Sequence, residues 1–249
     1  MVIRPAAAVV SLLALFASIQ AHAAELKVFS STSLKAALEE LGPQFEKTTE
    51  NKLVLTIGPA AVLKPQIDGG APFDVAILTP AMIDALVAAG KIDPTSRARI
   101  ARAGLGVAVR ADAAKPDVST ADALKRALLN AKSVGFNSQG ASRAGIEAVL
   151  AKLGIADEIK SRIKLLPVSA PVAVAAGDVE IGLGPVSEIF IVPGTQVAGA
   201  FPAEYQWYLE VTGGVASDSK IAAAARALIK FLTAPSAIPV LKAKGMEPG

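Results

Sequence analysis

Short apolar runs alternate with helical patterns along almost the whole chain. Runs with the length and composition of buried strands cover residues 26–29, 53–57, 75–78, 105–109, 134–136, 163–166, 179–183 and 208–215. Apolar residues recur at helical spacing over residues 34–48, 80–89, 121–129, 142–153, 219–232 and 235–244. This alternation predicts an α/β fold in which sheets of mostly parallel strands are flanked by helices.

Two segments predict that the chain is divided into two lobes. The strand at 105–109 leaves one strand–helix series and continues into another, and the strand at 208–215 leads back before two closing helices. We expect one lobe from residues 24–106 plus 209–249 and a second from 107–208. Two crossing segments would join them and permit closure like a hinge. One large domain is the alternative that the chain length also allows.

Four turns follow predicted strands, at residues 30–33, 58–61, 137–142 and 184–188. Ligands of open α/β sheets bind outside the carboxyl ends of the strands, so these turns form the candidate binding site. In the third turn Gly140 permits close approach of the backbone, and Ser138 and Ser142 flank it. We expect a concave group of N–H donors there that suits an anion, with an ordinary turn as the alternative.

The first turn is rich in hydroxyl groups. Ser30, Ser31, Thr32 and Ser33 lie between a predicted strand and a long amphipathic helix. Unpaired N–H groups and the positive end of the helix dipole favour an anion at such a position. Simple capping of the helix is the alternative, because Ser and Thr are preferred at helix starts in general.

Residues 1–23 have the features of a cleaved secretory leader. Arg4 supplies the positive charge, residues 6–19 form the apolar run, and Ala21, His22 and Ala23 fit the small-residue cleavage pattern. Cleavage after Ala23 would release a protein that begins at Ala24 into the periplasm. An uncleaved anchor is the alternative, although the apolar run is short for a membrane span.

Composition excludes several kinds of chemistry. The chain has no cysteine, and its single histidine is His22 in the predicted leader. Catalysis by Ser-His-Asp or Cys-His groups and zinc sites of the usual ligand type are therefore excluded, and we expect no metal and no cofactor. The net charge is only +3, the basic residues are scattered and aromatic residues make up 4% of the chain. These values argue against a nucleic-acid partner.

Short motifs in a constant order give the mature chain a family resemblance. They are VFSSTSL at 28–34, GGAPFDV at 69–75, GAS at 140–142, LGI at 153–155 and FLTAP at 231–235. With these motifs the chain resembles periplasmic substrate-binding proteins of the molybdate-binding, ModA-like type. The resemblance implies a two-lobed type II periplasmic binding protein fold, a small anion held between the lobes by neutral donors, and an ABC permease in the inner membrane as partner. We expect a monomer.

The resemblance also assigns ligand-binding positions. It places the first ligand hydroxyl of the family at Ser33, and the second anion-binding turn falls on Ala60 and Ala61, where the hydroxyls are missing. The late turn contains Ser187 but no tyrosine. Because fewer neutral donors remain, we expect an anion other than molybdate. The full set of expected ligand-binding residues is Ser31, Thr32, Ser33, Ala60, Ala61, Ser138, Gly140, Ser142, Arg143, Ala170 and Ser187.

Arg143 is the charged residue that we expect to face the site. A cation is unfavourable in the first turn of a helix, so an anionic partner would explain it. Guanidinium also matches a carboxylate through paired hydrogen bonds. A solvated surface arginine is the alternative. Lys64 is a weaker candidate of the same kind.

Two functions from different classes fit these observations. A transport receptor needs only a closing cleft with well-placed donors. Residues 181–206 resemble instead an organic-anion subgroup of the family that includes periplasmic aconitate isomerases, and such an enzyme needs a base and cationic clamps. Its catalytic residues would be Glu188, Lys64 and Arg143. We favour the receptor; an adhesin or antigen built on the same scaffold is a third possibility.

Overall fold

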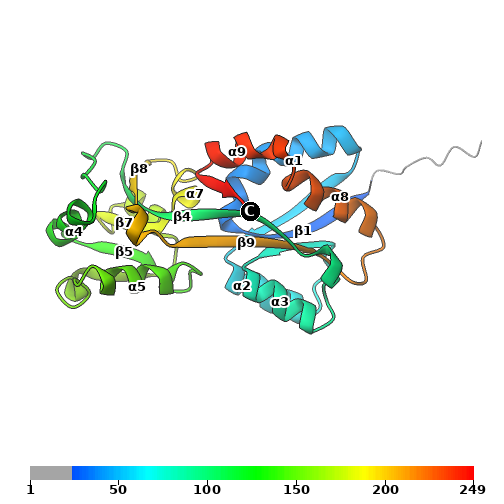
Figure 1. The fold of residues 1–249 in the computed structure, drawn as a ribbon, viewed down its shortest axis with the longest axis horizontal. Helices are drawn as coiled ribbons and strands as arrows, with labels where there is room; N and C mark the ends of the chain where they lie inside the picture. Colours follow the sequence, from blue (N-terminus) through cyan, green and yellow to red (C-terminus); the bar gives the residue numbers. More distant parts are fainter. Residues whose placement is uncertain (1–23) are drawn as a thin grey trace, which may run out of the picture.

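The computed structural model describes residues 24–249, so the predicted leader and its cleavage site lie outside the described residues. The described chain forms two halves that lie end to end along the long axis of the molecule (Figure 1). Each half has a sheet with helices on both faces. The predicted α/β class and the two-lobed architecture are confirmed by this arrangement.

The first half is built on the sheet β2–β1–β3–β9–β4 with β10 on its edge. Its strands are β1 (Glu25–Ser31), β2 (Lys52–Gly58), β3 (Val75–Leu78), β4 (Ala98–Arg110), β9 (Tyr208–Val215) and β10 (Met246–Pro248). β1 pairs in parallel with β2 and β3, whereas β9, β4 and β10 are joined by antiparallel pairs. The helices are α1 (Lys35–Thr49), α2 (Ala60–Asp68), α3 (Pro80–Ala88), α8 (Ala222–Leu232) and α9 (Ile238–Ala243).

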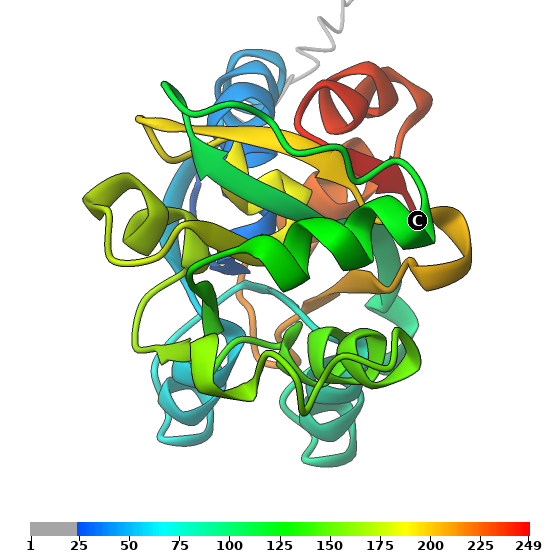
Figure 2. The same ribbon diagram turned by 90° about the vertical axis from the view of Figure 1, so that its left-hand side faces the viewer.

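The second half repeats this plan. β5 (Val134–Asn137) pairs in parallel with β6 (Ile163–Leu166) and β7 (Ile181–Pro185), and β4 pairs antiparallel with β7 and β8 (Thr195–Ala200). Figure 2 views this half from its outer end, with its helices around the sheet. The helices are α4 (Ala121–Asn130), α5 (Arg143–Lys152), α6 (Ala170–Ala176) and α7 (Val186–Ile189). The predicted parallel pairing therefore holds for three strands in each half, and the strands that cross between the halves add the antiparallel pairs.

β4 and β9 connect the two halves (Figure 1). β4 pairs with β9 as far as Gly104, which lies opposite Tyr208, and with β7 from Leu105 onward. The predicted strand at 105–109 is thus the second part of a longer strand that begins at Ala98. The lobe boundaries at 106/107 and 208/209 stay a proposal. Both lie close to the residues at which β4 changes its pairing partner from β9 to β7.

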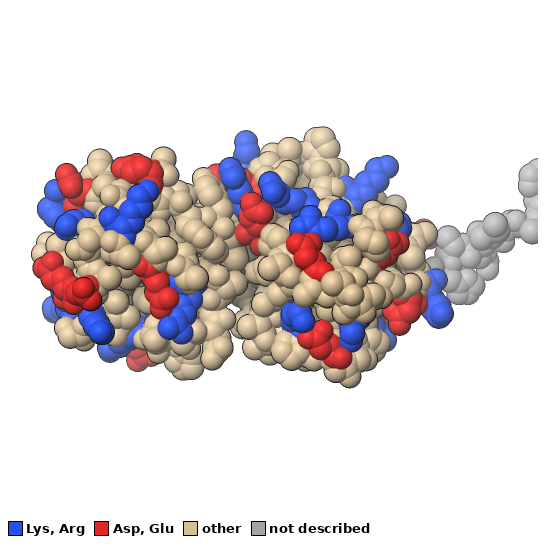
Figure 3. All heavy atoms as spheres, turned by 60° about the horizontal axis from the view of Figure 1, so that its bottom comes forward, with Lys and Arg blue, Asp and Glu red and all other residues tan. Residues whose placement is uncertain are grey.

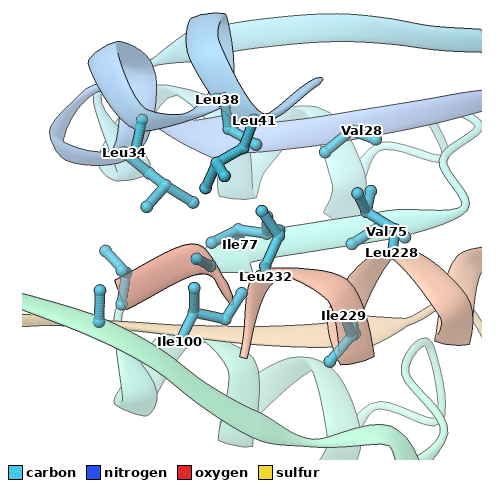
Figure 4. Packing of buried hydrophobic residues seen from close by; sticks show 14 of the residues in the cluster. Val28, Leu34, Leu38, Leu41, Val75, Ile77, Ile100, Leu228, Ile229 and Leu232 are labelled. Carbon is cyan, nitrogen blue, oxygen red and sulfur yellow. The ribbon is translucent and has the colours of Figure 1, made fainter. Parts of the chain in front are cut away.

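The core of the first half forms where α1, α8 and α9 cover one face of the sheet. Apolar residues of α1 repeat at helical spacing and point toward strand residues of the same kind. Figure 4 shows Leu34, Leu38 and Leu41 above the sheet, with Leu228 and Leu232 from α8 beside them. A separate buried cluster lies under α2 and α3 on the other face. This packing fixes the positions of the strand ends that lead into the turns.

Some elements were not predicted. β8 consists mostly of small and polar residues, and β10 has three residues, so neither carries an apolar run long enough to indicate a strand. Short 3-10 helices also occur: η1 (Thr32–Leu34), η2 (Pro94–Ser96), η3 (Lys160–Arg162), η4 (Ala203–Tyr205) and η5 (Pro235–Ala237).

One face of the molecule carries charges of both signs. On the face drawn in Figure 3, basic and acidic side chains are interspersed over both halves. In the described part of the chain, no single helix is long and apolar enough to cross a membrane. Taken together, α8 and the segment Pro235–Ala243, which meet at a bend of 55°, match a membrane span in length and composition only.

Candidate functional site

A cavity of about 320 Å³, here called the cleft, is lined by residues from both halves. The first half contributes the end of β1 and the starts of η1 and α2, and the second half contributes the turns that follow β5, β6 and β7. The cleft therefore lies at the carboxyl ends of the parallel strands, where the sequence places the four turns. Its main polar or small lining residues are Ser31, Thr32, Ser33, Ala60, Asn137, Gly140, Ser142, Ser169, Ala170, Gly184 and Glu188.

Helix starts bring the positive ends of their dipoles to this cleft. α1 follows the turn at Ser31–Ser33 through η1, α2 begins at Ala60, and α5 begins after Ser142. Each such terminus acts as roughly half a positive charge, so three of them supply about +1.5 in total. Among the described residues, none that lines the cleft is Lys, Arg or His. The positive potential of the cleft therefore comes from the backbone.

The serines of these turns are not used as helix caps. Ser31, Ser142 and Ser169 stand at the starts of η1, α5 and α6, and none of them makes a side-chain cap hydrogen bond. Ser33 lies inside η1 and is 1% exposed. Capping was the alternative explanation for these hydroxyl groups, and the geometry of these helix starts does not support it.

One hydrogen bond joins the two halves inside the cleft. The Ser33 hydroxyl donates to Oε1 of Glu188 over 2.7 Å, although the two residues are 155 positions apart in the sequence. Glu188 belongs to α7 in the second half and is half-buried. Burial raises the pKa of the Glu188 carboxyl above its ordinary value, and the hydrogen bond from Ser33 opposes that rise. The cleft thus contains an acid that can hold a proton more readily than a surface glutamate.

Most of the residues that we predicted for the site do line the cleft. They are Ser31, Thr32, Ser33, Ala60, Gly140, Ser142, Ala170 and Glu188. Ala61, Ser138 and Ser187 are not among the lining residues. Ala61 is exposed, whereas Ser187 is 1% exposed and its Oγ has no hydrogen-bond partner in the described part of the chain. The ligand contacts of all these residues stay predictions.

The two basic candidates, Arg143 and Lys64, are not among the residues that line the cleft, and their ligand-binding and catalytic roles stay predictions. The Arg143 Nε donates to Glu147 Oε1 over 2.8 Å, and its Nη1 donates to the carbonyl of Ser138 over 3.1 Å. Lys64 Nζ forms an ion pair with Asp68 over 2.6 Å. Each carboxylate lies four residues further along the same helix, and such pairs form readily on helix surfaces. Local partners on their own helices therefore hold both cations.

Sequence reasoning did not name two polar residues of the cleft as ligand-binding. Asn137 is the last residue of β5, and Ser169 stands directly before α6, as Ser142 does before α5. The same rule, that polar residues at strand ends and helix starts meet at one edge of a sheet, would have identified both.

Comparisons with known proteins agree with the fold. Residues 26–247 match the family described as bacterial extracellular solute-binding protein. Aconitate isomerase from a Pseudomonas species is 30% identical over 230 residues, which cover 90% of this chain and 87% of that protein. The molybdate-binding protein ModA of Azotobacter vinelandii is 29% identical over 245 residues, or 90% of each chain.

Solved structures show the same architecture. The periplasmic molybdate-binding protein of Azotobacter vinelandii superimposes with a TM-score of 0.76 at 23% identity, covering 90% of this chain and 99% of that one. The type II binding-protein fold and the resemblance to molybdate-binding proteins are thereby confirmed. This chain belongs to the bacterial extracellular solute-binding protein family.

Proposed function

We propose that this protein is a periplasmic receptor that captures a small anion in the cleft and delivers it, as a monomer, to an ABC-type permease of the inner membrane. One observation supports this proposal above all. Three helix starts from both halves converge on one cleft, and the serines at two of them, Ser31 before η1 and Ser142 before α5, do not cap their own helices. Such donors, with the positive ends of the helix dipoles, stabilise an anion.

The size of the cleft favours an organic anion. Its volume of about 320 Å³ lies at the lower end of the range of about 300–1,000 Å³ for small-molecule pockets. A tetrahedral oxyanion would fill only part of this space, whereas a small polycarboxylate would contact both halves at once. Because the arginine that we expected as a carboxylate clamp is paired with Glu147, backbone N–H groups and hydroxyls would bind the carboxylates.

A panel of anions tests the receptor function. The ligand binds only the folded protein, so at a hundredfold excess over its dissociation constant we expect a gain in stability of about 2.7 kcal/mol. Thermal unfolding would be followed with molybdate, tungstate, sulfate, phosphate, citrate, cis-aconitate and trans-aconitate, against sodium chloride at matched ionic strength. We expect a carboxylate to give the largest shift. The protein must first be freed of any bound ligand. Equal unfolding curves for all anions and for chloride would then contradict the proposal.

Glu188 supports a second candidate, aconitate isomerase. Interconversion of cis- and trans-aconitate can proceed by removing a proton from the methylene carbon and returning it to the other end of the allylic system. Glu188 lines the cleft, and its raised pKa suits a group that accepts and then releases a proton. The relative that carries this activity matches 90% of this chain.

Proton NMR in deuterated water tests this candidate. Purified protein is expected to convert trans-aconitate into the cis isomer and, if Glu188 exchanges its proton with solvent, to introduce deuterium at the reacting carbons. Heat-denatured protein is the control. Binding of trans-aconitate without conversion over hours would rule out the isomerase and leave the receptor function in place.

A further inference from the structure

We propose that the Ser33–Glu188 pair makes anion capture proton-dependent, so that the cleft takes up a proton together with its anion. This inference rests on the proposed function, because it requires an anion in the cleft. It adds a role for a carboxyl group that anion binding alone does not explain.

The contact between Ser33 and Glu188 carries the argument. Ser33 Oγ lies 2.7 Å from Glu188 Oε1, and the Ser33 hydroxyl has a single proton, which it donates to Glu188 when that carboxyl is ionised. With Glu188 ionised, the cleft therefore presents a carboxylate and the lone pairs of Ser33 to an incoming anion. With Glu188 neutral, its O–H donates to Ser33 Oγ and the Ser33 O–H turns to the anion. Protonation thus reverses the bond, removes a negative charge and adds a donor.

The charge balance of the cleft favours the protonated form once an anion has entered. The three helix starts supply about +1.5, and an ionised Glu188 would reduce this to about +0.5. Among residues 24–249, no basic side chain lines the cleft to compensate for that loss. Burial also raises the pKa of the Glu188 carboxyl, so less free energy is needed to protonate it.

Other charged groups near α7 have their own partners. Five elements pack against α7. Three of them carry no ionisable side chain, namely η1, β7 and β8, whereas the other two, β4 and α1, do. The pairs on these two elements are Arg99–Glu210, Arg102–Glu247, Arg110–Asp112, Lys35–Glu39, Lys244–Glu40 and Lys52–Glu46, and Lys47 of α1 is exposed. Across the cleft Arg143 is paired with Glu147. Burial and the Ser33 hydrogen bond are the causes that shift the pKa of Glu188.

Calorimetry at several pH values, in buffers of different ionisation enthalpy, measures the coupled proton. The probes are molybdate, which has no titrating proton near neutral pH, and trans-aconitate. For wild type we expect uptake of about one proton per anion between the pKa of Glu188 in the free protein and its higher pKa in the anion complex. In that range the dissociation constant should increase about tenfold per pH unit. Glu188→Gln keeps a neutral donor toward Ser33 and should show neither effect.

Glu158→Gln is the matched control, since Glu158 is an exposed acid of the second half. It should keep the proton uptake and the pH dependence of wild type. The inference is overturned if wild type binds without proton uptake, if Glu188→Gln retains the uptake, or if folded Glu188→Gln no longer binds. If neither anion binds wild type at any pH, the proposed function fails and this inference fails with it.

Discussion

Replacing Ala60 by aspartate is expected to weaken anion binding by about a hundred- to a thousandfold, which corresponds to about 2.7–4 kcal/mol. Ala60 is the first residue of α2 and lines the cleft. A carboxylate there would occupy the N–H groups that the ligand needs, and it would repel the anion in a cleft without basic side chains among the described residues. Isothermal titration with the strongest anion of the panel gives the affinity.

A negative charge in the first turn of a helix is favourable, but Ala60 is 4% exposed and packs in the cluster under α2 and α3, so the buried carboxylate also lowers stability. Circular dichroism and thermal unfolding of the variant therefore precede the titration, and only folded protein is titrated. Ala61→Asp is the matched control. Ala61 is the next residue of α2 and is exposed outside the cleft, so the variant adds the same charge to the same helix start. Solvent screens that exposed charge, and the affinity should stay within about threefold of wild type. Equal losses in both variants would show that net charge, and not the cleft, controls binding.

Phe45→Ala is expected to lower the free energy of unfolding by about 3–5 kcal/mol. The Phe45 side chain is 0% exposed in the cluster between α1 and the first sheet, and its ring lies 5.6 Å from that of Phe231. Truncation removes the buried contacts of this ring with the core cluster and with Phe231 of α8. It leaves a cavity that the closely packed core cannot close. Chemical denaturation of the ligand-free protein measures the loss.

Phe190→Ala is the control for this prediction, because it removes the same atoms from a side chain that is 54% exposed. We expect a loss below about 1 kcal/mol, since much of that ring remains in water in the folded protein. Similar losses for the two variants would mean that burial in the first core does not set the stability. Anion affinity of the Phe45 variant, measured well below its unfolding temperature, should be close to that of wild type.

Local patterns were sufficient for the architecture. Apolar runs and helical spacing identified most strands and helices, because each element buries its own face and therefore carries its own period. The crossing strand at 208–215 coincides with β9, and all four predicted turns contribute to the walls of the cleft. A further segment, residues 167–171 after β6, also lines the cleft and was not among the predicted turns. The rule that ligands bind at the carboxyl ends of parallel strands then selected the site, since that edge of the sheet depends on strand direction alone.

Contacts between distant residues required the tertiary structure. The sequence suggested Arg143 and Lys64 as cations of the site, but Glu147 and Asp68 on the same helices hold them. It did not suggest that Ser33 meets Glu188, because the folding of both halves brings these residues together. A local pattern records which face of an element is buried, whereas the partner of a polar side chain depends on the relative position of whole elements. The polar chemistry of the cleft is therefore a property of the assembled fold.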